Sequence, residues 1–403
     1  MKLSKNIQRV FASLLLVAWC LFAILNGVFS APHIGSAYKR MWGGTAEKLA
    51  ASVEAANGQI VFQDALQDAA GSIRSVLNKQ LINGFSLVQG ADGQLSYTNF
   101  YPYALLDYDE PAQKVQQLSL AAERQGASFL YLNCIDLYDE EHNVFGDLPA
   151  NNFNPRSNAF LYALRGYSVD TLDARALLKA SSLDRSQYLY KTEPHWTVQA
   201  CFEVFRTLVE TLQKQGSQID PEGFFTDSTN YLHTLYPQSY LGKMGKMAGA
   251  TYSGYDDFTL IEPNFRTDFT ISYSLVDNRD DVRGDFSDTI LDAHWMESDN
   301  PYENDMYCSY LSENYAYRKI TNNLLAEGPR ILVVGDSYML PVTAFLATSA
   351  SEIVLLSPYS LPEGITNLVE YLDTNAFDHV IVGLNPGTLH ENGWNFLTGI
   401  ELP

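Results

Sequence analysis

Hydrophobic and polar positions alternate between helical and strand-like spacing in two stretches of the chain. In the first stretch, apolar residues at helical spacing over 115–122 precede Arg-Gln-Gly at 124–126, and the β-rich run Ser-Phe-Leu-Tyr-Leu follows at 128–132. A basic last turn followed by glycine is typical of a helix end. The pattern predicts a helix that leads into a strand, which is half of a βαβ unit.

The second stretch lies near the C-terminus and repeats this pattern. It predicts a strand at 331–334, a helix at 341–348, a strand at 353–356, a helix at 367–372 and a strand at 379–384. These strands are apolar on both faces, as in parallel sheets that are covered by helices. We therefore expect an α/β fold with three layers, in which helices cover both faces of a mainly parallel sheet.

The region between these stretches has a different character. Residues from about 221 to 325 are rich in Tyr, Asp, Asn and Gly, and they include period-two fragments such as 269–273. Alternation of this kind predicts strands. We interpret 221–325 as a β-rich insertion or lid on an α/β core that spans 78–403.

An apolar run without a charged residue occupies 10–29, after a short tail whose charged residues are all basic. About 20 apolar residues match the thickness of a bilayer, and the basic flank predicts an N-terminus in the cytoplasm. Val-Phe-Ser at 28–30 also fits a signal-peptidase site. We expect 1–30 to be a signal anchor or a cleaved signal peptide, and we favour the anchor. Residues 31–77 are expected to form a helical connector. The remaining domain is then outside the cell, held at the membrane by one transmembrane helix or secreted.

Charge and cysteine content narrow the classes of function. The net charge is −21, from 47 acidic and 26 basic residues. Such a surface repels phosphate groups, which excludes a nucleic-acid partner. Cys134, Cys201 and Cys308 follow the apolar run, and their spacing does not suit a metal site. We interpret Cys134 and Cys201 as small buried apolar side chains, and we predict no metal site.

The strongest candidate for chemistry is Gly-Asp-Ser at 335–337, directly after the strand predicted at 331–334. Functional groups gather beyond the carboxyl ends of strands in open α/β sheets. There the hydroxyl of Ser337 can be exposed, and its own backbone N–H, near a helix N-terminus, can bind a developing oxyanion. Met339 stands where Gly-x-Ser-x-Gly has its second glycine, which argues against the nucleophile elbow of the α/β-hydrolases.

A second polar group follows the last predicted strand, which ends in Gly-Leu-Asn at 383–385. An amide side chain at this place can complete an oxyanion hole with the Ser337 N–H. The same residues also fit a turn made by Asn-Pro-Gly at 385–387. Asn385 is therefore a candidate oxyanion donor, with the turn as the alternative interpretation.

A candidate general base precedes a predicted amphipathic helix, for which Thr197 is a suitable N-cap. His195 lies just before that helix N-terminus, whose positive end favours the neutral imidazole that a base requires. Glu193 can orient the ring and stabilise the imidazolium that forms during turnover. Trp196 can pack over the ring or bind a sugar.

Asp-Ala-His-Trp at 292–295 offers a second pairing of an acid with a histidine. No apolar helical stripe and no threonine cap follow it, because the next residues, 296–301, are mostly polar. We interpret this second pair as part of a solvated loop or an insertion strand.

The segment Lys-Thr-Glu-Pro-His-Trp-Thr at 191–197 resembles the Thr-Asp-x-His-Trp-Thr motif of the alginate O-acetyltransferase-like SGNH hydrolase family and of the related DHHW proteins. The resemblance covers about 104–384, including the approach to the nucleophile strand at 310–315. It implies an SGNH-hydrolase-like sandwich in which the acid and histidine precede the serine along the chain.

The resemblance also implies roles for individual residues. Ser337 corresponds to the nucleophile, His195 to the base and Glu193 to the orienting acid, and no metal or organic cofactor is needed. Tyr338 and Asn314, together with the tryptophan after His195, are candidate substrate-binding residues. The implied chemistry transfers an acetyl group to a surface polysaccharide or removes one, with a membrane-bound acyl-transfer partner as a candidate donor.

Two departures from the family pattern leave a second hypothesis open. The acid is Glu193 where the family has aspartate, and 357–359 is Ser-Pro-Tyr where the family often has an arginine. The leading hypothesis is an extracytoplasmic O-acetyltransferase or acetylesterase. The alternative is a catalytically degenerate polysaccharide-binding component of a membrane-associated assembly, and a lipid esterase is a third candidate.

Overall fold

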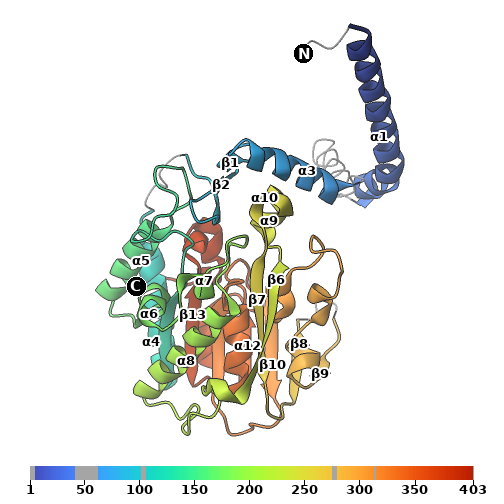
Figure 1. Ribbon diagram of the computed structural model, residues 1–403. Helices are drawn as coiled ribbons and strands as arrows, with labels where there is room; N and C mark the ends of the chain where they lie inside the picture. The colour runs from blue at the N-terminus through green and yellow to red at the C-terminus, as the bar shows by residue number, and fades with distance from the viewer. Residues whose placement is uncertain (1–4, 41–61, 101–105, 275–278, 313–314, 403) are drawn as a thin grey trace. The chain divides into compact units, whose positions relative to one another are not determined.

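The computed structural model describes residues 5–40, 62–100, 106–274, 279–312 and 315–402 (Figure 1). The chain divides into two units, Met1–Ile73 and Arg74–Pro403. Helix α1 (Lys5–Arg40) contains the apolar run at 10–29, and α3 (Gln63–Val76) lies in the predicted connector. Within the described residues, no helix has both the length and the apolar character needed to cross a membrane, so the predicted transmembrane helix is not confirmed.

The second unit is built on one large mixed sheet. Its strands, in spatial order, are β5 (Thr171–Asp173), β4 (Ser128–Asn133), β13 (His379–Leu384), β11 (Arg330–Gly335), β12 (Glu352–Leu356), β10 (Tyr317–Asn322), β8 (Phe269–Tyr273) and β9 (Val282–Gly284). The first five strands are parallel to one another. The last three pair antiparallel. The predicted strands and their parallel pairing are therefore confirmed.

Helices cover both faces of this sheet (Figure 1). One core joins alternate strand residues such as Ile331 and Val333 to α8 (Val198–Lys214) and α12 (Met339–Ser349). The other core joins Leu332 and Val334 and their neighbours to α4 (Asp109–Arg124), α5 (Asn154–Gly166) and α13 (Leu368–Thr374). Both faces of the central strands are buried, as their continuous apolar runs predict. The result is the expected three-layer α/β arrangement.

The β-rich region at 221–325 divides between a separate ribbon and the main sheet. Strands β6 (Tyr231–Tyr240) and β7 (Asp256–Pro263) form a separate antiparallel ribbon, and Figure 1 shows α9 (Lys243–Ala248) and α10 (Ala250–Ser253) at its tip. However, β8, β9 and β10 extend the main sheet. The period-two pattern of β8 and β10 buries one face against the same core that α8 and α12 cover.

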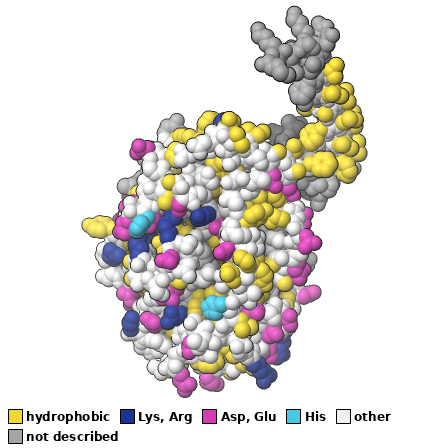
Figure 2. Space-filling view, viewed as in Figure 1, with side chains coloured by type: hydrophobic (Ala, Val, Ile, Leu, Met, Phe, Trp, Pro, Cys, Tyr) yellow, Lys and Arg dark blue, Asp and Glu magenta, His cyan; other side chains and the backbone are white. Residues whose placement is uncertain are grey.

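Shorter elements complete the described chain. They are β1 (Leu81–Ile82), β2 (Leu87–Gln89), β3 (Leu95–Tyr97), α6 (Ala174–Ala180), α7 (Arg185–Tyr188), α11 (Phe286–Thr289) and the 3₁₀ segments Ser228–Asn230, Ala293–Met296, Met306–Ser309, Pro386–Thr388 and Glu391–Leu397. Cys134 and Cys201 are buried free thiols, as expected, and Cys308 is a partly buried one. Acidic side chains are spread over the face of the molecule shown in Figure 2.

Two neighbouring strands bring the candidate serine and asparagine to the same edge of the sheet. Gly335 at the end of β11 pairs in register with Gly383 near the end of β13. A Cβ on Gly335 would lie 2.6 Å from Cβ of Met339, and a Cβ on Gly383 would overlap the Met339 sulfur. Both glycines are therefore needed for α12 to start close above the sheet.

Candidate active site

Three side chains that lie far apart in sequence form a hydrogen-bonded line. His195 Nε2 lies 2.8 Å from Ser337 Oγ, and His195 Nδ1 lies 2.6 Å from Glu193 Oε1. Because an ionised carboxylate only accepts hydrogen bonds, the Nδ1 proton points to Glu193. The lone pair on Nε2 is then directed at the serine hydroxyl. Ser337 is partly exposed, as a nucleophile must be.

Glu193 is held at both carboxylate oxygens. Its Oε2 accepts the backbone N–H of Lys243 at 2.7 Å, while its Oε1 bonds to His195. Burial acts to raise the pKa of Glu193, but the hydrogen bond and charge of His195 and the Lys243 N–H outweigh it, so the pKa is lowered. The carboxylate therefore stays ionised and can orient the imidazole.

The loop that carries Glu193 is fixed by the ribbon formed by β6 and β7. The carboxylate of Asp256 accepts the backbone N–H groups of Lys191 and Thr192, both at 2.8 Å, and the Thr192 hydroxyl at 2.7 Å. Gly242, just before α9, lies so close to Glu193 that a Cβ on it would overlap the Glu193 side chain. Sequence reasoning missed these supports, because no local pattern links residues that are about 50 positions apart.

Two features hold His195 in place: the capped start of α8 and the ring of Tyr307. Thr197 caps α8 by accepting the Ala200 N–H at 3.1 Å, as its sequence position predicts. The imidazole stacks on the ring of Tyr307, with centroids 4.2 Å apart and an interplanar angle of 14°. The Tyr307 hydroxyl lies 3.2 Å from the carbonyl oxygen of Ser337, so one buried tyrosine contacts both the base and the nucleophile loop.

Trp196 and Tyr338 are placed differently from what the sequence suggested. The Trp196 indole is fully buried, and its Nε1 donates to the Tyr338 carbonyl at 2.9 Å, so it supports the nucleophile loop and presents no surface to a sugar. Tyr338 is only 8% exposed, and its hydroxyl donates to the Pro194 carbonyl. Both residues position the backbone around the site. Asn314 lies outside the described residues.

The nucleophile loop is tied to the neighbouring loop by Asp336. Its buried carboxylate accepts the Tyr338 N–H at 3.1 Å, the Asn385 N–H at 2.8 Å and the Thr388 hydroxyl at 2.7 Å. Burial raises the pKa of Asp336 despite these hydrogen bonds. No described residue accepts the backbone N–H of Ser337, which leaves this donor available to an oxyanion.

Asn385 forms the turn that its sequence context allows. Its Oδ1 accepts the Gly387 N–H at 2.8 Å, which forms the expected turn. Its Nδ2 donates to the Ile135 carbonyl at 3.0 Å. An amide nitrogen carries two hydrogens, and the role of the second as an oxyanion donor stays a prediction.

The second acid–histidine pair lies in a short 3₁₀ segment away from any bond to Ser337. His294 Nδ1 lies 2.5 Å from Asp292 Oδ1, and the Ser312 hydroxyl donates to Asp292 Oδ2 at 3.2 Å. The His294 side chain is 60% exposed. The pair is therefore a solvated surface contact, as the absence of a following helix indicated.

The segment at 357–359, where the family often has an arginine, contacts the loop after β13. The Tyr359 hydroxyl lies 3.0 Å from Thr388 Oγ1. An arginine is present on the adjacent strand: Arg318 pairs in register with Leu355, and its guanidinium lies 4.8 Å from the ring centroid of Tyr315. Arg318 thus lies on the strand next to β12, over the ring of Tyr315.

Comparison with known proteins matches the fold. No family model and no curated protein sequence matches the chain. It is similar to the structure of PatB1 from Bacillus cereus, with 15% identity over 77% of this chain and 99% of that chain and a TM-score of 0.60. PatB1 with a sulfonyl adduct gives 16% identity over 77% and 97% of the two chains, with a TM-score of 0.59.

A DHHW family protein from Eubacterium siraeum is also similar, with 16% identity over 77% of this chain and 97% of that chain and a TM-score of 0.55. The resemblance that the motif at 191–197 indicated is therefore confirmed as a likeness of fold.

Proposed function

We propose that this protein is an extracytoplasmic, serine-dependent O-acetyltransferase or acetylesterase that acts on a cell-surface polysaccharide. The observation that carries the proposal is the continuous line from Ser337 through His195 to Glu193, with distances of 2.8 and 2.6 Å. Nucleophile, base and orienting acid in this order are the parts of a catalytic triad. The apolar run at 10–29 supports attachment to a membrane, where an acyl-transfer partner can supply the donor.

The triad performs the reaction in two steps. Ser337 Oγ attacks the acetyl carbonyl while His195 Nε2 takes its proton, and the Ser337 N–H and Asn385 amide hold the oxyanion. The imidazolium then protonates the leaving alcohol, which departs and leaves an acetyl-serine. In the second step His195 removes a proton from a sugar hydroxyl or from water, and that oxygen attacks the acetyl carbonyl. The bond between the acetyl group and Ser337 Oγ then breaks, and the imidazolium returns the proton to Ser337 Oγ.

Hydrolysis of a small acetyl ester by the full-length protein tests the proposal. We expect Ser337→Ala and His195→Ala each to lower kcat about 10³-fold or more, because triad members act as a unit. His294→Ala, which removes the histidine of the exposed pair with Asp292, is the matched control and should retain the wild-type rate. A sulfonyl fluoride should label Ser337 only in proteins that retain His195.

Equal background rates in the wild type and both triad variants would contradict the enzyme and favour the polysaccharide-binding alternative. Preferential turnover of long-chain esters would instead favour a lipid esterase.

A further inference from the structure

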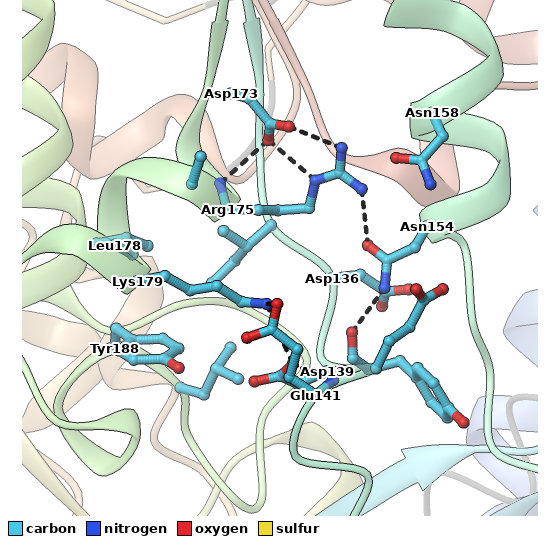
Figure 3. Close-up of a pocket in the computed structure, with 15 residues that line it drawn as sticks. Asp136, Asp139, Glu141, Asn154, Asn158, Asp173, Arg175, Leu178, Lys179 and Tyr188 are labelled. Atoms are coloured by element: carbon cyan, nitrogen blue, oxygen red, sulfur yellow. Dashed lines mark hydrogen bonds and ion pairs between the residues drawn. The ribbon is translucent and has the colours of Figure 1, made fainter.

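A pocket with a volume of about 310 Å³ lies at the carboxyl ends of β4 and β5. Figure 3 shows that charged and amide side chains from several segments point into it. The volume is at the lower end of the range for small-ligand sites. In open α/β sheets, ligands bind beyond this same edge of the strands. We call this hollow the acceptor pocket.

Residues that line the acceptor pocket contact residues near the triad. The carbonyl of Ile135, which lines the pocket, accepts the Asn385 amide at 3.0 Å. Leu189, another lining residue, pairs through its backbone with Trp196, directly after the base. The charge of Asp136 acts on Tyr338, next to the nucleophile. Two residues of the pocket lining thus contact residues that lie next to the triad or that could help it bind an oxyanion.

The positive charges of the acceptor pocket are already neutralised. Arg175 makes a two-point contact with Asp173, at 2.9 and 2.7 Å, and also donates to Asn154 at 3.1 Å (Figure 3). Lys179 lies 3.4 Å from Asp139 and 3.2 Å from Glu141. Neither cation is left to hold an anionic ligand.

The acceptor pocket keeps a net negative charge after these ion pairs are counted. The lining contains three more acidic than basic residues, and neither Asp136 nor Glu140 forms an ion pair with a described residue. Backbone N–H groups of Phe153, Tyr138 and Leu137 bond to Asp136. A carboxylate has about four acceptor positions, so Asp136 can still accept a hydroxyl from a ligand.

We propose that the acceptor pocket holds a sugar unit that is uncharged or carries an amino group, and that it rejects uronic acid units. This inference rests on the proposed acetyl transfer to a glycan. Sugar hydroxyls donate to Asp136 and Glu140, and an amino group adds attraction to the uncompensated charge. A uronate would bring its carboxylate against those acids without a free cation to balance it.

Binding of three tetrasaccharides to the full-length protein, measured by calorimetry, tests this inference. Cellotetraose is neutral, chitotetraose carries amines, and tetragalacturonate carries carboxylates. We expect the first two to bind and the third to have a Kd at least about tenfold higher. Asp136→Asn and Glu140→Gln should each raise the Kd for chitotetraose about tenfold, as expected for losing a hydrogen bond to a charged group.

Glu222→Gln is the matched control, because it removes one charge from an exposed turn outside the pocket and should leave the Kd unchanged. Glu140 is exposed, so its variant tests the pocket without disturbing the core. Tight binding of tetragalacturonate, absence of binding of all three sugars, or an unchanged Kd in both pocket variants would overturn the inference. Failure of the proposed function would be seen in a different experiment, the ester-hydrolysis assay. There the wild type would show no hydrolysis that depends on Ser337.

Discussion

Glu193 is longer by one methylene group than the aspartate found in similar proteins, and its surroundings take up the extra length. Its two oxygens bond to His195 Nδ1 at 2.6 Å and to the Lys243 N–H at 2.7 Å. Gly242 lets the ribbon tip approach closely enough for the second bond. The site thus fits a glutamate at this position. The second of its two hydrogen bonds depends on Gly242, which lies outside the motif at 191–197.

Shortening or neutralising Glu193 should therefore have different effects. Glu193→Asp cannot reach both partners, and we expect kcat for ester hydrolysis to fall about 10- to 100-fold, or roughly 1.4–2.7 kcal/mol in barrier height. Glu193→Gln keeps the length but removes the charge that stabilises the imidazolium, so a loss of about 10³- to 10⁴-fold is expected. Steady-state kinetics measure both. A wild-type kcat for Glu193→Asp would contradict the matching argument.

The sequence predicted the three bonded residues because each lies in a local pattern. Ser337 follows an apolar strand, and His195 precedes a capped amphipathic helix, with Glu193 two positions earlier. Their supports could not be predicted in the same way. Asp256 and Tyr307 reach the site from distant elements, and an isolated buried acid or tyrosine has no pattern in the sequence.

At the scale of elements, the start of α12 depends on two glycines in neighbouring strands. Met339 is fully buried and lies over both Gly335 and Gly383. Gly383→Ala should destabilise the fold by about 1–3 kcal/mol through overpacking, and it should slow sulfonyl fluoride labelling of Ser337. Met339→Ala alone should cost about 2–5 kcal/mol through the cavity it leaves.

Combining the two substitutions separates this packing from general damage. In Gly383→Ala/Met339→Ala, the new methyl group enters the space that the methionine leaves. The loss in unfolding free energy, from urea titration, should therefore be smaller than the sum of the single losses. Gly166→Ala is the control, because a Cβ there meets no atom within 4 Å. Strict additivity would show that the glycines are not required by Met339.

Strands could be predicted from the sequence where both of their faces are apolar, or where apolar residues alternate regularly on one face. The strand expected at 379–384 is β13, and the period-two fragment at 269–273 is β8. That β8 joins the main sheet could not be predicted, because alternation predicts a strand but not the sheet that it joins. Its partner β10 is set by tertiary packing.

For the whole molecule, stability should respond to pH through a histidine and three acids that act in opposite directions. Burial lowers the pKa of His379, whose ring nitrogens each lie 2.7 Å from a hydroxyl, those of Ser128 and Ser217. The neutral ring therefore stabilises the fold at pH above the unfolded-state pKa of about 6.5. This contribution is lost as the pH falls through the lower folded-state pKa.

Three buried carboxyls have the opposite sign, whereas Glu193, whose pKa is lowered, acts in the same direction as His379. Burial raises the pKa of Asp136 to about 6, and it also raises the pKa of Asp256 and Asp336. Their protonated forms stabilise the fold at pH below about 3.9, the unfolded-state value. That stability is lost as the pH rises through the folded-state pKa. The pH profile of the wild type is thus a difference of two trends, and His379 must be isolated by comparison with a variant.

His379→Gln makes that comparison, because glutamine keeps hydrogen-bonding groups but does not titrate. We expect the wild type to lose unfolding free energy relative to the variant as the pH falls below about 6.5, by up to about 1.4 kcal/mol per pH unit. Urea titrations of both proteins between neutral and mildly acidic pH measure the difference, from which the carboxyl contributions cancel. Parallel profiles would mean that protonation of His379 is not linked to folding. A widening gap would show that protonation of His379, at the amino end of β13 and therefore away from the triad, destabilises the fold in acid.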